Sequence, residues 1–350
     1  MEPATAEELA LRVGEHADKY SQSRMDITFA GDDPLQAGRE FFGTAVSALY
    51  DRLPRTAELQ LSVQTPAASL RRTMMEFFLR NHIQVDAAVD AIPQPVSRPT
   101  NVSQDATGIQ LLQELRYTPV YRRLVYPLSL QDDPVRTYKS FQKIWTPAVD
   151  FVLPHGTWES PPPGRTPHNP ATPYADWFIP MFDHWINHDM PATTPLLLDN
   201  IISGLLGNKT FTEAIGKQQQ ATVTVGPFGD YRRPAADIQS SGEPASLDMN
   251  IFEHPLHTAA RHPRIRRRLA QTALSDTCRS CQLVEVCGGG MYAHRYSEAR
   301  YFSNPSVYCP DLTKLILHIH QTVSAEMQKK ERDPQALPNQ QITAIKQPGQ

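Results

Sequence analysis

The sequence predicts an α/β protein, in which a parallel sheet, open or barrel-like, precedes a small C-terminal metal module. Strand-like and helix-like stretches alternate up to residue 206 with short connections, as is typical of parallel strand–helix–strand units. All four cysteines then fall within 32 positions, from Cys278 to Cys309. A chain of 350 residues is long enough for one large α/β unit and a smaller second one.

The expected helices have apolar residues on one face and recognisable starts. The first has Thr5 as its N-cap, with Glu7 and Glu8 in its first turn. The ranges that we expect to be helical are 5–20, 35–53, 68–81, 108–115, 134–145, 174–186 and 311–327.

The expected strands are short apolar or alternating runs that end at turn residues. The first, 25–30, is interrupted by Gly31-Asp32-Asp33-Pro34. The stretches 221–225 and 230–233, joined through 226–229, predict a hairpin, and 196–206 is apolar. The strands expected in the parallel sheet are 25–30, 58–65, 83–89, 122–128 and 149–153. We therefore divide the chain into a barrel (1–220), a metal module with the last helix (221–327) and a disordered tail (328–350).

The cysteines are spaced C-x2-C-x5-C-x21-C, and three glycines follow Cys287. A CxxC turn lets two sulfurs bind one ion or one corner of a cluster. Two disulfides are the alternative, but the first 20 residues resemble an amphipathic helix and no signal peptide, so we expect a cytoplasmic protein, where disulfides are rare. The spacing predicts one metal site formed by Cys278, Cys281, Cys287 and Cys309, holding Zn or an iron–sulfur cluster.

The composition excludes two classes of partner. The 34 basic and 37 acidic side chains give a net charge of −3, which does not suit a nucleic-acid partner. The basic run 261–268 is interpreted as a solvated helix face. No run of 18 apolar residues exists, so we expect no membrane span.

The region 248–312 resembles the SPASM-type C-terminal region of radical SAM peptide maturases, and in particular the cyclophane-forming group. The matching stretches are 251–255, 287–296 and 302–309 together with the cysteine spacing, and more weakly 150–158 and 172–177. The resemblance implies a partial (β/α) barrel of the radical SAM type, plus a SPASM-like module whose four cysteines hold an auxiliary [4Fe–4S] cluster.

Three departures from that family concern its SAM site. No cysteine precedes Cys278, so the CxxxCxxC triad that binds the SAM-cleaving cluster is absent, and the chain starts as if the first strand were missing. The family's Gly-Gly-Glu-Pro turn is replaced by Gly31-Asp32-Asp33-Pro34, and its later Thr-Asn-Gly-like stretch by Gln64-Thr65-Pro66-Ala67. A complete enzyme whose start lies upstream would explain the first departure only. We therefore expect no reductive cleavage of SAM.

Polar residues at the expected strand ends and in the following loop and helix are the site candidates. His184 and His188 are spaced i,i+4 on one helix, and imidazoles suit non-haem iron or the axial position of haem, although chance pairing is the plainer explanation. His155 follows a buried strand, and for His294 we expect cluster support or core packing. The candidate iron or haem ligands are His155, His184 and His188; the candidate catalytic residues are His155, Tyr174 and Asp176; the candidate anchors for a substrate ammonium are Asp32, Asp33 and Asp176.

The sequence thus favours a repurposed scaffold: an iron- or haem-dependent oxidoreductase or oxygenase that tailors an amino acid or a precursor peptide in natural-product biosynthesis. The expected partners are that small molecule or peptide and a second copy of the chain in a homodimer. The competing hypothesis is a non-catalytic protein that binds a peptide or a partner enzyme, with a structural metal at the four cysteines.

Overall fold

A computed structural model describes residues 1–90, 104–166, 169–187, 193–210, 212–216, 222–269 and 274–332. The six strands of the larger sheet are all parallel and pair in chain order, from β1 at one edge to β6 at the other. They are β1 Arg24–Phe29, β2 Glu58–Pro66, β3 Gln84–Ala88, β4 Tyr121–Pro127, β5 Ala148–Val152 and β6 Thr194–Pro195. The predicted parallel α/β sheet is therefore confirmed.

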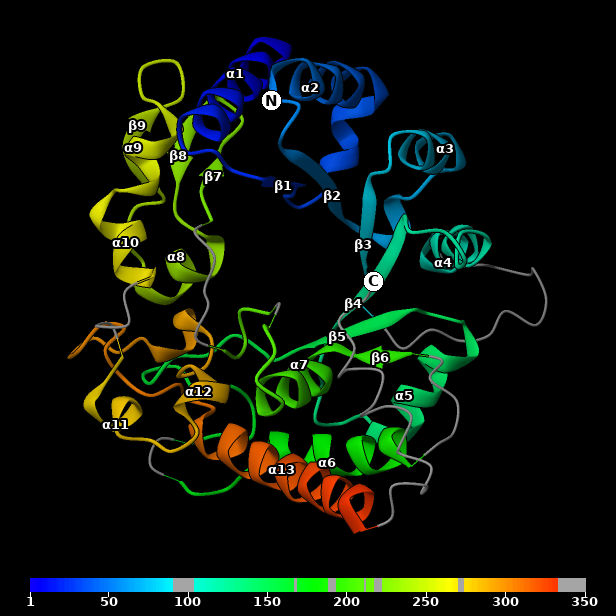
Figure 1. The fold of residues 1–350 in the computed structure, drawn as a ribbon, viewed down its shortest axis with the longest axis vertical. Helices are drawn as coiled ribbons and strands as arrows, with labels where there is room; N and C mark the ends of the chain where they lie inside the picture. Colours follow the sequence, from blue (N-terminus) through cyan, green and yellow to red (C-terminus); the bar gives the residue numbers. More distant parts are fainter. Residues whose placement is uncertain are drawn as a thin grey trace.

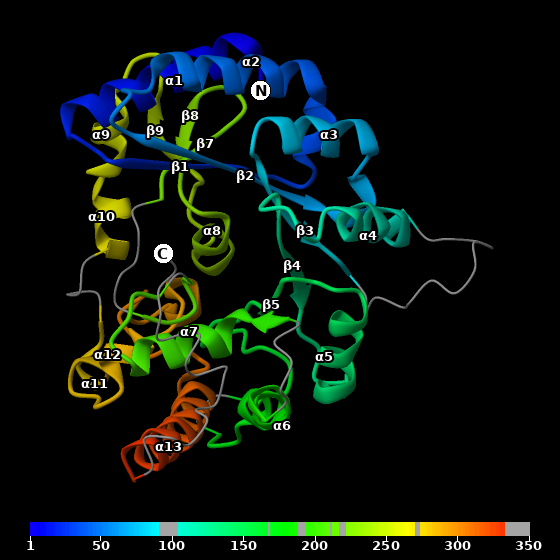
Figure 2. The same cartoon turned by 45° about the vertical axis from the view of Figure 1, so that its right-hand side comes forward.

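Helices follow the strands and cover the outer face of the curved sheet, as Figures 1 and 2 show. Residues of β1 alternate in exposure: Met25, Ile27 and Phe29 pack against the core, and the residues between them are exposed. The helices and 3-10 turns of this half are α1 Pro3–Lys19, η1 Pro34–Ala37, α2 Gly38–Arg52, η2 Ala67–Ser69, α3 Arg72–Arg80, α4 Gln104–Glu114, α5 Pro134–Lys143, α6 Pro173–Ile186 and α7 Leu196–Leu205.

The first helix shows how the local sequence sets an element. Buried residues recur every three or four positions along α1, which gives it one apolar stripe that packs against α2. It begins at Pro3, before the expected Thr5, because proline is favoured in the first turn of a helix. The buried stripe comprises Thr5, Ala6, Ala10, Val13, Gly14 and Ala17.

The predicted hairpin is present as β7 Thr224–Val225 and β8 Asp230–Arg232. A third strand that we did not predict, β9 Ser246–Asn250, completes a small antiparallel sheet with its own apolar core around Tyr231 and Leu247. The helices beside this sheet are α8 Ala235–Ser241, α9 Leu256–Ala260 and α10 Pro263–Leu269.

The C-terminal part consists of short helices and one long one. These are α11 Asp276–Arg279, α12 Val284–Cys287, η4 Tyr292–Arg295 and α13 Cys309–Arg332. Helix α13 packs against α6 and α7 and contributes to the main core, so the division at residue 220 crosses a continuous apolar interior and stays a prediction. The helix also continues beyond Met327; the rest of the expected tail, 333–350, lies outside the described residues.

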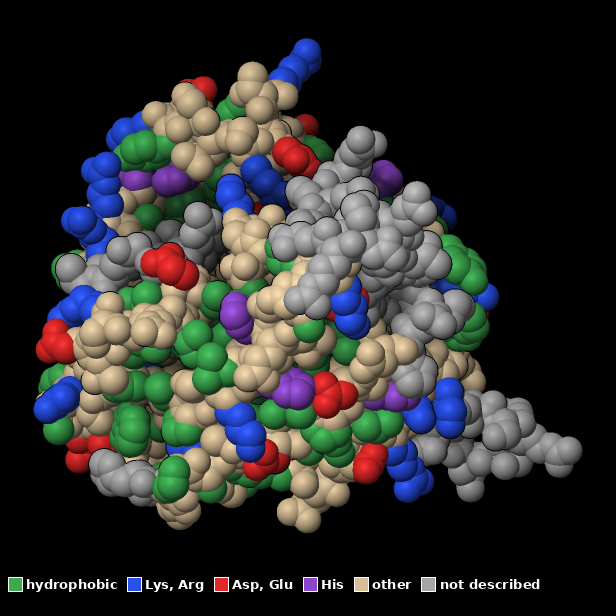
Figure 3. Space-filling model, turned by 60° about the horizontal axis from the view of Figure 1, so that its bottom comes forward, with side chains coloured by type: hydrophobic (Ala, Val, Ile, Leu, Met, Phe, Trp, Pro, Cys, Tyr) green, Lys and Arg blue, Asp and Glu red, His purple; other side chains and the backbone are tan. Residues whose placement is uncertain are grey.

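No helix in the described part of the chain is long and apolar enough to cross a membrane. Figure 3 views the lower side of the molecule, where hydrophobic, basic, acidic and histidine side chains are interspersed on the part that the described residues form. That visible face thus carries no continuous basic surface of the kind that nucleic-acid binding requires.

The contact between α4 and η2 leads to a stability prediction. A Cβ added at Gly108 of α4 would overlap the carbonyl oxygen of Ala67, which is backbone and cannot rotate away. We expect Gly108→Ala to lower the free energy of unfolding by about 3 kcal/mol, because overpacking forces backbone shifts. In the matched change Gly43→Ala, on α2, the new Cβ meets nothing within 4 Å, and helix propensity should add about 0.5 to 1 kcal/mol. Urea unfolding of both variants tests this, and equal midpoints would contradict the packing.

Candidate functional site

The four cysteines line one pocket. Cys278 lies on α11, Cys281 in the turn after it, Cys287 at the end of α12 and Cys309 at the start of α13. All four are free thiols. The other walls are mostly apolar, and are formed by Thr277, Leu283, Val284, Gly289, Ser306, Leu312, Thr313 and Ile316. The structure thus brings the four predicted ligands together from three helices.

The donor chemistry of this pocket, four cysteine thiols around an apolar space, fits an iron–sulfur cluster. Thiolates that bind a cluster each take a different iron, so they surround a pocket and do not converge on one point. Among the described residues, no group of three or more His, Cys, Asp or Glu side chains is arranged to hold a single ion. Burial and the neighbouring Cys309 and Cys278 raise the pKa of Cys287 to about 11, so binding of a metal must displace its proton.

The glycine backbone after Cys287 can lie close to a group bound in the cysteine pocket. Gly288, Gly289 and Gly290 have φ values of 61°, 85° and 73°, in the left-handed region that side chains disfavour. The buried Arg295 guanidinium donates to the carbonyls of Gly288 at 2.8 Å and of Gly289 at 3.1 Å, which fixes this turn. Burial lowers the pKa of Arg295, and the charges of Cys278 and Cys287 oppose that shift, so thiolates and guanidinium stabilise each other.

A second, much larger cavity of about 1450 Å³ lies between the sheet and the cysteine-bearing region. One wall is β1 and the loop after it, including Asp32 and Asp33. The opposite wall includes Met291, His294 and Tyr308, which lie between Cys287 and Cys309 in the chain. In Figure 1 the corresponding ribbons surround the centre of the molecule. This cavity exceeds the range of about 300 to 1,000 Å³ that is common for small-molecule sites.

Asp32 and Asp33 both line this cavity but differ in their contacts. Asp33 accepts hydrogen bonds from the Leu35 N–H at 3.2 Å and the Ser69 hydroxyl at 2.8 Å, so it caps η1 and ties it to η2. Asp32 is exposed and has no hydrogen bond or ion pair within the described residues. Of these two predicted anchors for an ammonium group, Asp32 is the one whose carboxylate is available.

Arg123 and Asp150 line the cavity and belong to a charge cluster that we did not predict, whose other members, Asp86 and Arg122, are not among the lining residues. Arg123 of β4 reaches Asp86 of β3 and Asp150 of β5, both at 3.0 Å. Asp86 is fully buried and also pairs with Arg122, whose side chain is 39% exposed. Burial raises the pKa of Asp150, and Arg123 opposes that shift. In the sequence, the only indication of these ion pairs was the presence of charged residues within the otherwise apolar strands β3, β4 and β5.

His155 lies in the loop after β5, as predicted, and its closest ring neighbour is His294. The two ring centroids are 5.9 Å apart, and the His155 Nε2 lies 3.5 Å from the Ser240 hydroxyl. His294 lines the cavity, whereas His155 is not among the lining residues. Two histidines line the cavity, His16 of α1 and His294, and to His294 we had assigned only a supporting or packing role.

The other predicted site residues lie elsewhere. His184 on α6 packs against Tyr138 of α5 with ring centroids 6.1 Å apart, and it does not line the cavity. His188, its expected partner, lies outside the described residues. The structure thus does not bring His184 together with His155, and a metal role for His184 and His188 stays a prediction.

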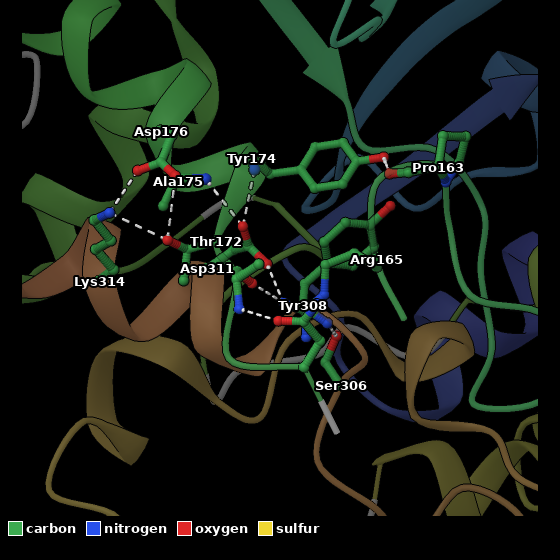
Figure 4. Close-up of polar contacts among 12 residues, drawn as sticks. Pro163, Arg165, Thr172, Tyr174, Ala175, Asp176, Ser306, Tyr308, Asp311 and Lys314 are labelled. Carbon is green, nitrogen blue, oxygen red and sulfur yellow. Dashed lines mark hydrogen bonds and ion pairs between the residues drawn. The ribbon is translucent and has the colours of Figure 1, made fainter. Parts of the chain in front are cut away.

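Tyr174 and Asp176 connect α6 to α13, as Figure 4 shows. The buried Tyr174 hydroxyl donates to the Pro163 carbonyl at 2.7 Å, and the exposed Asp176 pairs with Lys314 at 2.5 Å. Asp311 of α13 accepts the N–H groups of Tyr174 at 2.8 Å and Ala175 at 3.1 Å, thereby capping α6. These contacts give Tyr174 and Asp176 a structural role at the junction of α6 and α13.

His294 should make folding stability depend on pH. Burial, helped by His155, lowers the pKa of His294 to about 4 from 6.5. Between these values the unfolded chain binds a proton that the folded chain does not, so stability falls as the pH drops from 6.5 towards 4. We expect His294→Phe to reduce the loss of unfolding free energy between pH 7.5 and 4.5 by about 2 kcal/mol. Urea titrations at the two pH values measure this, and an unchanged pH difference would contradict the buried position of the imidazole.

Comparison with solved structures identifies the fold. The structure matches that of anSMEcpe with bound AdoMet at a TM-score of 0.76 and 14% identity, over 99% of this chain and 89% of that one. It matches anSMEcpe with AdoMet and the Kp18Cys peptide at 0.74 and 15% identity, over 92% and 91% of the two chains. It also matches Streptococcus suis SuiB bound to the precursor peptide SuiA at 0.52 and 13% identity, over 86% and 68%.

No known protein family and no curated protein matches the sequence. At these identities the likeness to solved structures concerns the fold alone. The chain has the partial (β/α) barrel of the radical SAM type, with a C-terminal region that contains the four cysteines. The expected loss of the first strand and the expected cyclophane-forming subgroup stay predictions.

Proposed function

We propose that this protein tailors an amino acid or a peptide in natural-product biosynthesis, on a radical SAM-type scaffold that does not cleave SAM. The observation that carries the proposal is the cavity of about 1450 Å³ between the sheet and the cysteine-bearing region. It is large enough for a cofactor and a substrate together. The complexes of anSMEcpe with Kp18Cys and of SuiB with SuiA support a peptide as the substrate class.

The chemistry that we propose is that of an iron- or haem-dependent oxidoreductase of the oxygenase type. The four cysteines of the chain all belong to the pocket around Cys278, so none is left in the barrel to hold a SAM-cleaving cluster. Imidazole is a suitable ligand for iron, and two histidines, His16 and His294, line the cavity. Asp32, with its available carboxylate, would bind the ammonium group of the substrate.

The residues at the cysteine pocket fit a [4Fe–4S] cluster, and Zn is the other candidate. A cluster there would supply an electron-transfer centre, whereas Zn would be structural. To a group bound in this pocket, the chain contributes four thiols, mostly apolar walls and the positive charge of Arg295, which interacts with Cys278 and Cys287.

AdoMet cleavage tests this proposal against a complete radical SAM enzyme. We expect cluster-reconstituted protein, incubated anaerobically with AdoMet and dithionite, to form no 5′-deoxyadenosine above a protein-free control. Binding of AdoMet should be measured separately by equilibrium dialysis, because anSMEcpe and SuiB were both determined with it bound. Formation of 5′-deoxyadenosine in an amount equal to or above that of the protein would overturn the proposed loss of SAM chemistry.

A non-catalytic peptide-binding protein is the second candidate. The peptide complexes of two structural neighbours favour it, because peptide binding on this fold needs no chemistry of its own. Protein that contains one zinc ion, no sulfide and no iron would support this function over the first.

A further inference from the structure

Strand β1 is open along one edge, and that edge faces the large cavity. β1 is the first strand of the six-stranded sheet and, within the described residues, pairs only with β2. All of its residues, from Arg24 to Phe29, line the cavity. A strand that is paired on both sides presents alternate residues to one face of a sheet, whereas an edge strand also presents its backbone. From β2, β3 and β4, by contrast, the described lining includes Gln64 and Arg123 alone.

The orientation of the β1 backbone shows which polar groups lack a strand partner. The Glu58 N–H donates to the Ser23 carbonyl at 2.9 Å, so every second residue from Ser23 onward turns its N–H and C=O towards β2. The residues between them turn these groups away from β2, and they are Arg24, Asp26 and Thr28. In the part of the chain that the structure describes, no backbone group pairs with this outer edge. Such an edge is a template for a further strand.

The opposite side of the opening is formed by a second sheet edge and by α1. β7 is the outer strand of the small sheet, and residues 222–225 line the same cavity. Leu9 of α1 also lines it and packs against the apolar cores of both sheets. Figures 1 and 2 both show the small sheet next to β1, with α1 beside the two. An extended segment paired with β1 would therefore have α1 and β7 as its other neighbours.

The charged groups of the cavity favour a cationic ligand. Five carboxyl groups line it, against the two guanidinium groups of Arg24 and Arg123. Arg24 is already paired with Asp26 at 2.8 Å, and Arg123 is likewise paired with carboxylates of the sheet. Asp32 is exposed and has no ion pair within the described residues, so a Lys or Arg side chain of a ligand can pair with it. The five carboxyl groups are those of Asp26, Asp32, Asp33, Asp150 and Glu213.

We propose that the cavity binds a basic peptide as an additional strand on the free edge of β1. This rests on the proposed peptide substrate and specifies how it is held. The outward N–H and C=O groups of β1 bond to the peptide backbone whatever its sequence, and the carboxyl groups select Lys and Arg among its side chains. One face of β1 carries apolar side chains and the other carries Asp26, so basic and apolar residues should alternate in the peptide.

Fluorescence anisotropy with a labelled peptide of alternating Lys and Val tests the proposal on the full-length protein. We expect saturable binding to the native protein, and at least tenfold weaker binding of the counterpart with Glu in place of Lys. The Lys–Val peptide with N-methylated backbone amides should also bind at least tenfold more weakly, because it keeps every charge but lacks the N–H donors that pair with β1. Attraction by charge alone predicts equal affinity for the two Lys–Val peptides.

Thr28→Pro tests the same edge from the side of the protein. It removes one outward N–H and leaves the bonds to β2 in place, and an edge strand tolerates proline at such a position. We expect this variant to bind the Lys–Val peptide at least tenfold more weakly. Thr28→Val is the matched control: it removes the hydroxyl contact to Ser62 at 2.8 Å but keeps the N–H, so it should bind as the native protein does. Circular dichroism compares the folds, and the N-methylated peptide tests the native protein without any substitution.

The proposal is overturned if the native protein binds no Lys–Val peptide, if N-methylation leaves the affinity unchanged, or if a folded Thr28→Pro binds as Thr28→Val does. A native dimer that Thr28→Pro dissociates in analytical ultracentrifugation would show that a second copy covers the edge, which also overturns it. The proposed function is tested separately by 5′-deoxyadenosine formation and iron content, so its failure can be told apart from a failure of strand pairing.

Discussion

Asp311→Ala is expected to lower the free energy of unfolding by about 3 to 5 kcal/mol. Asp311 and Arg165 form an ion pair at 3.5 Å, and their side chains are 4% and 5% exposed. Removal of the carboxylate leaves the guanidinium buried without its partner, and it also removes the acceptor of two N–H groups at the start of α6. Urea unfolding measures the change.

Asp176→Ala provides the matched control, because it removes another carboxylate from the same junction of α6 and α13. Asp176 and Lys314 are 57% and 47% exposed, and such surface pairs contribute at most about 1 kcal/mol. If Asp311→Ala and Asp176→Ala destabilise the protein equally, the buried pair does not hold α13 to α6. Since α13 begins at Cys309, the Asp311 variant should also weaken metal retention, whereas the Asp176 variant should not.

Cys281→Ser is expected to abolish metal retention at the cysteine pocket. Cys281 joins α11 to α12, and serine would replace a thiolate ligand by a hydroxyl that binds iron and zinc poorly. The measurement is the metal and sulfide content of anaerobically purified protein, compared with Ser280→Ala, which changes the exposed neighbour. If the metal content at this pocket is the same in both variants, the four cysteines do not form one site.

The fold can be predicted well from the sequence wherever the pattern is local. The alternation along β1 and the glycines between β7 and β8 each predict an element that the structure contains. Strands β6 and β9 were missed because their pairing depends on neighbours that are distant in the chain: β6, Thr194–Pro195, is a strand only by its register with Ala148 and Val149.

The candidate site could also be predicted only in part, because some of its features depend on residues that are distant in the chain. Cysteine spacing is a local signal, and the four thiols do share a pocket. The charge cluster that includes Arg123 and Asp150 depends on partners on adjacent strands, such as Asp86 and Arg122, which lie 36 positions apart. The position of His294 at the cavity was not predicted, because it follows from how η4 packs against the loop after β5 and not from its own sequence context.

The metal and cofactor content of the native protein tests the central claim most directly. Anaerobically purified protein should be analysed for iron, zinc and acid-labile sulfide, and its absorbance recorded. Our account predicts iron and sulfide in the proportions of a [4Fe–4S] cluster at the cysteine pocket, together with further iron bound in the large cavity. Colourless protein with one zinc per chain and with neither iron nor sulfide would contradict it.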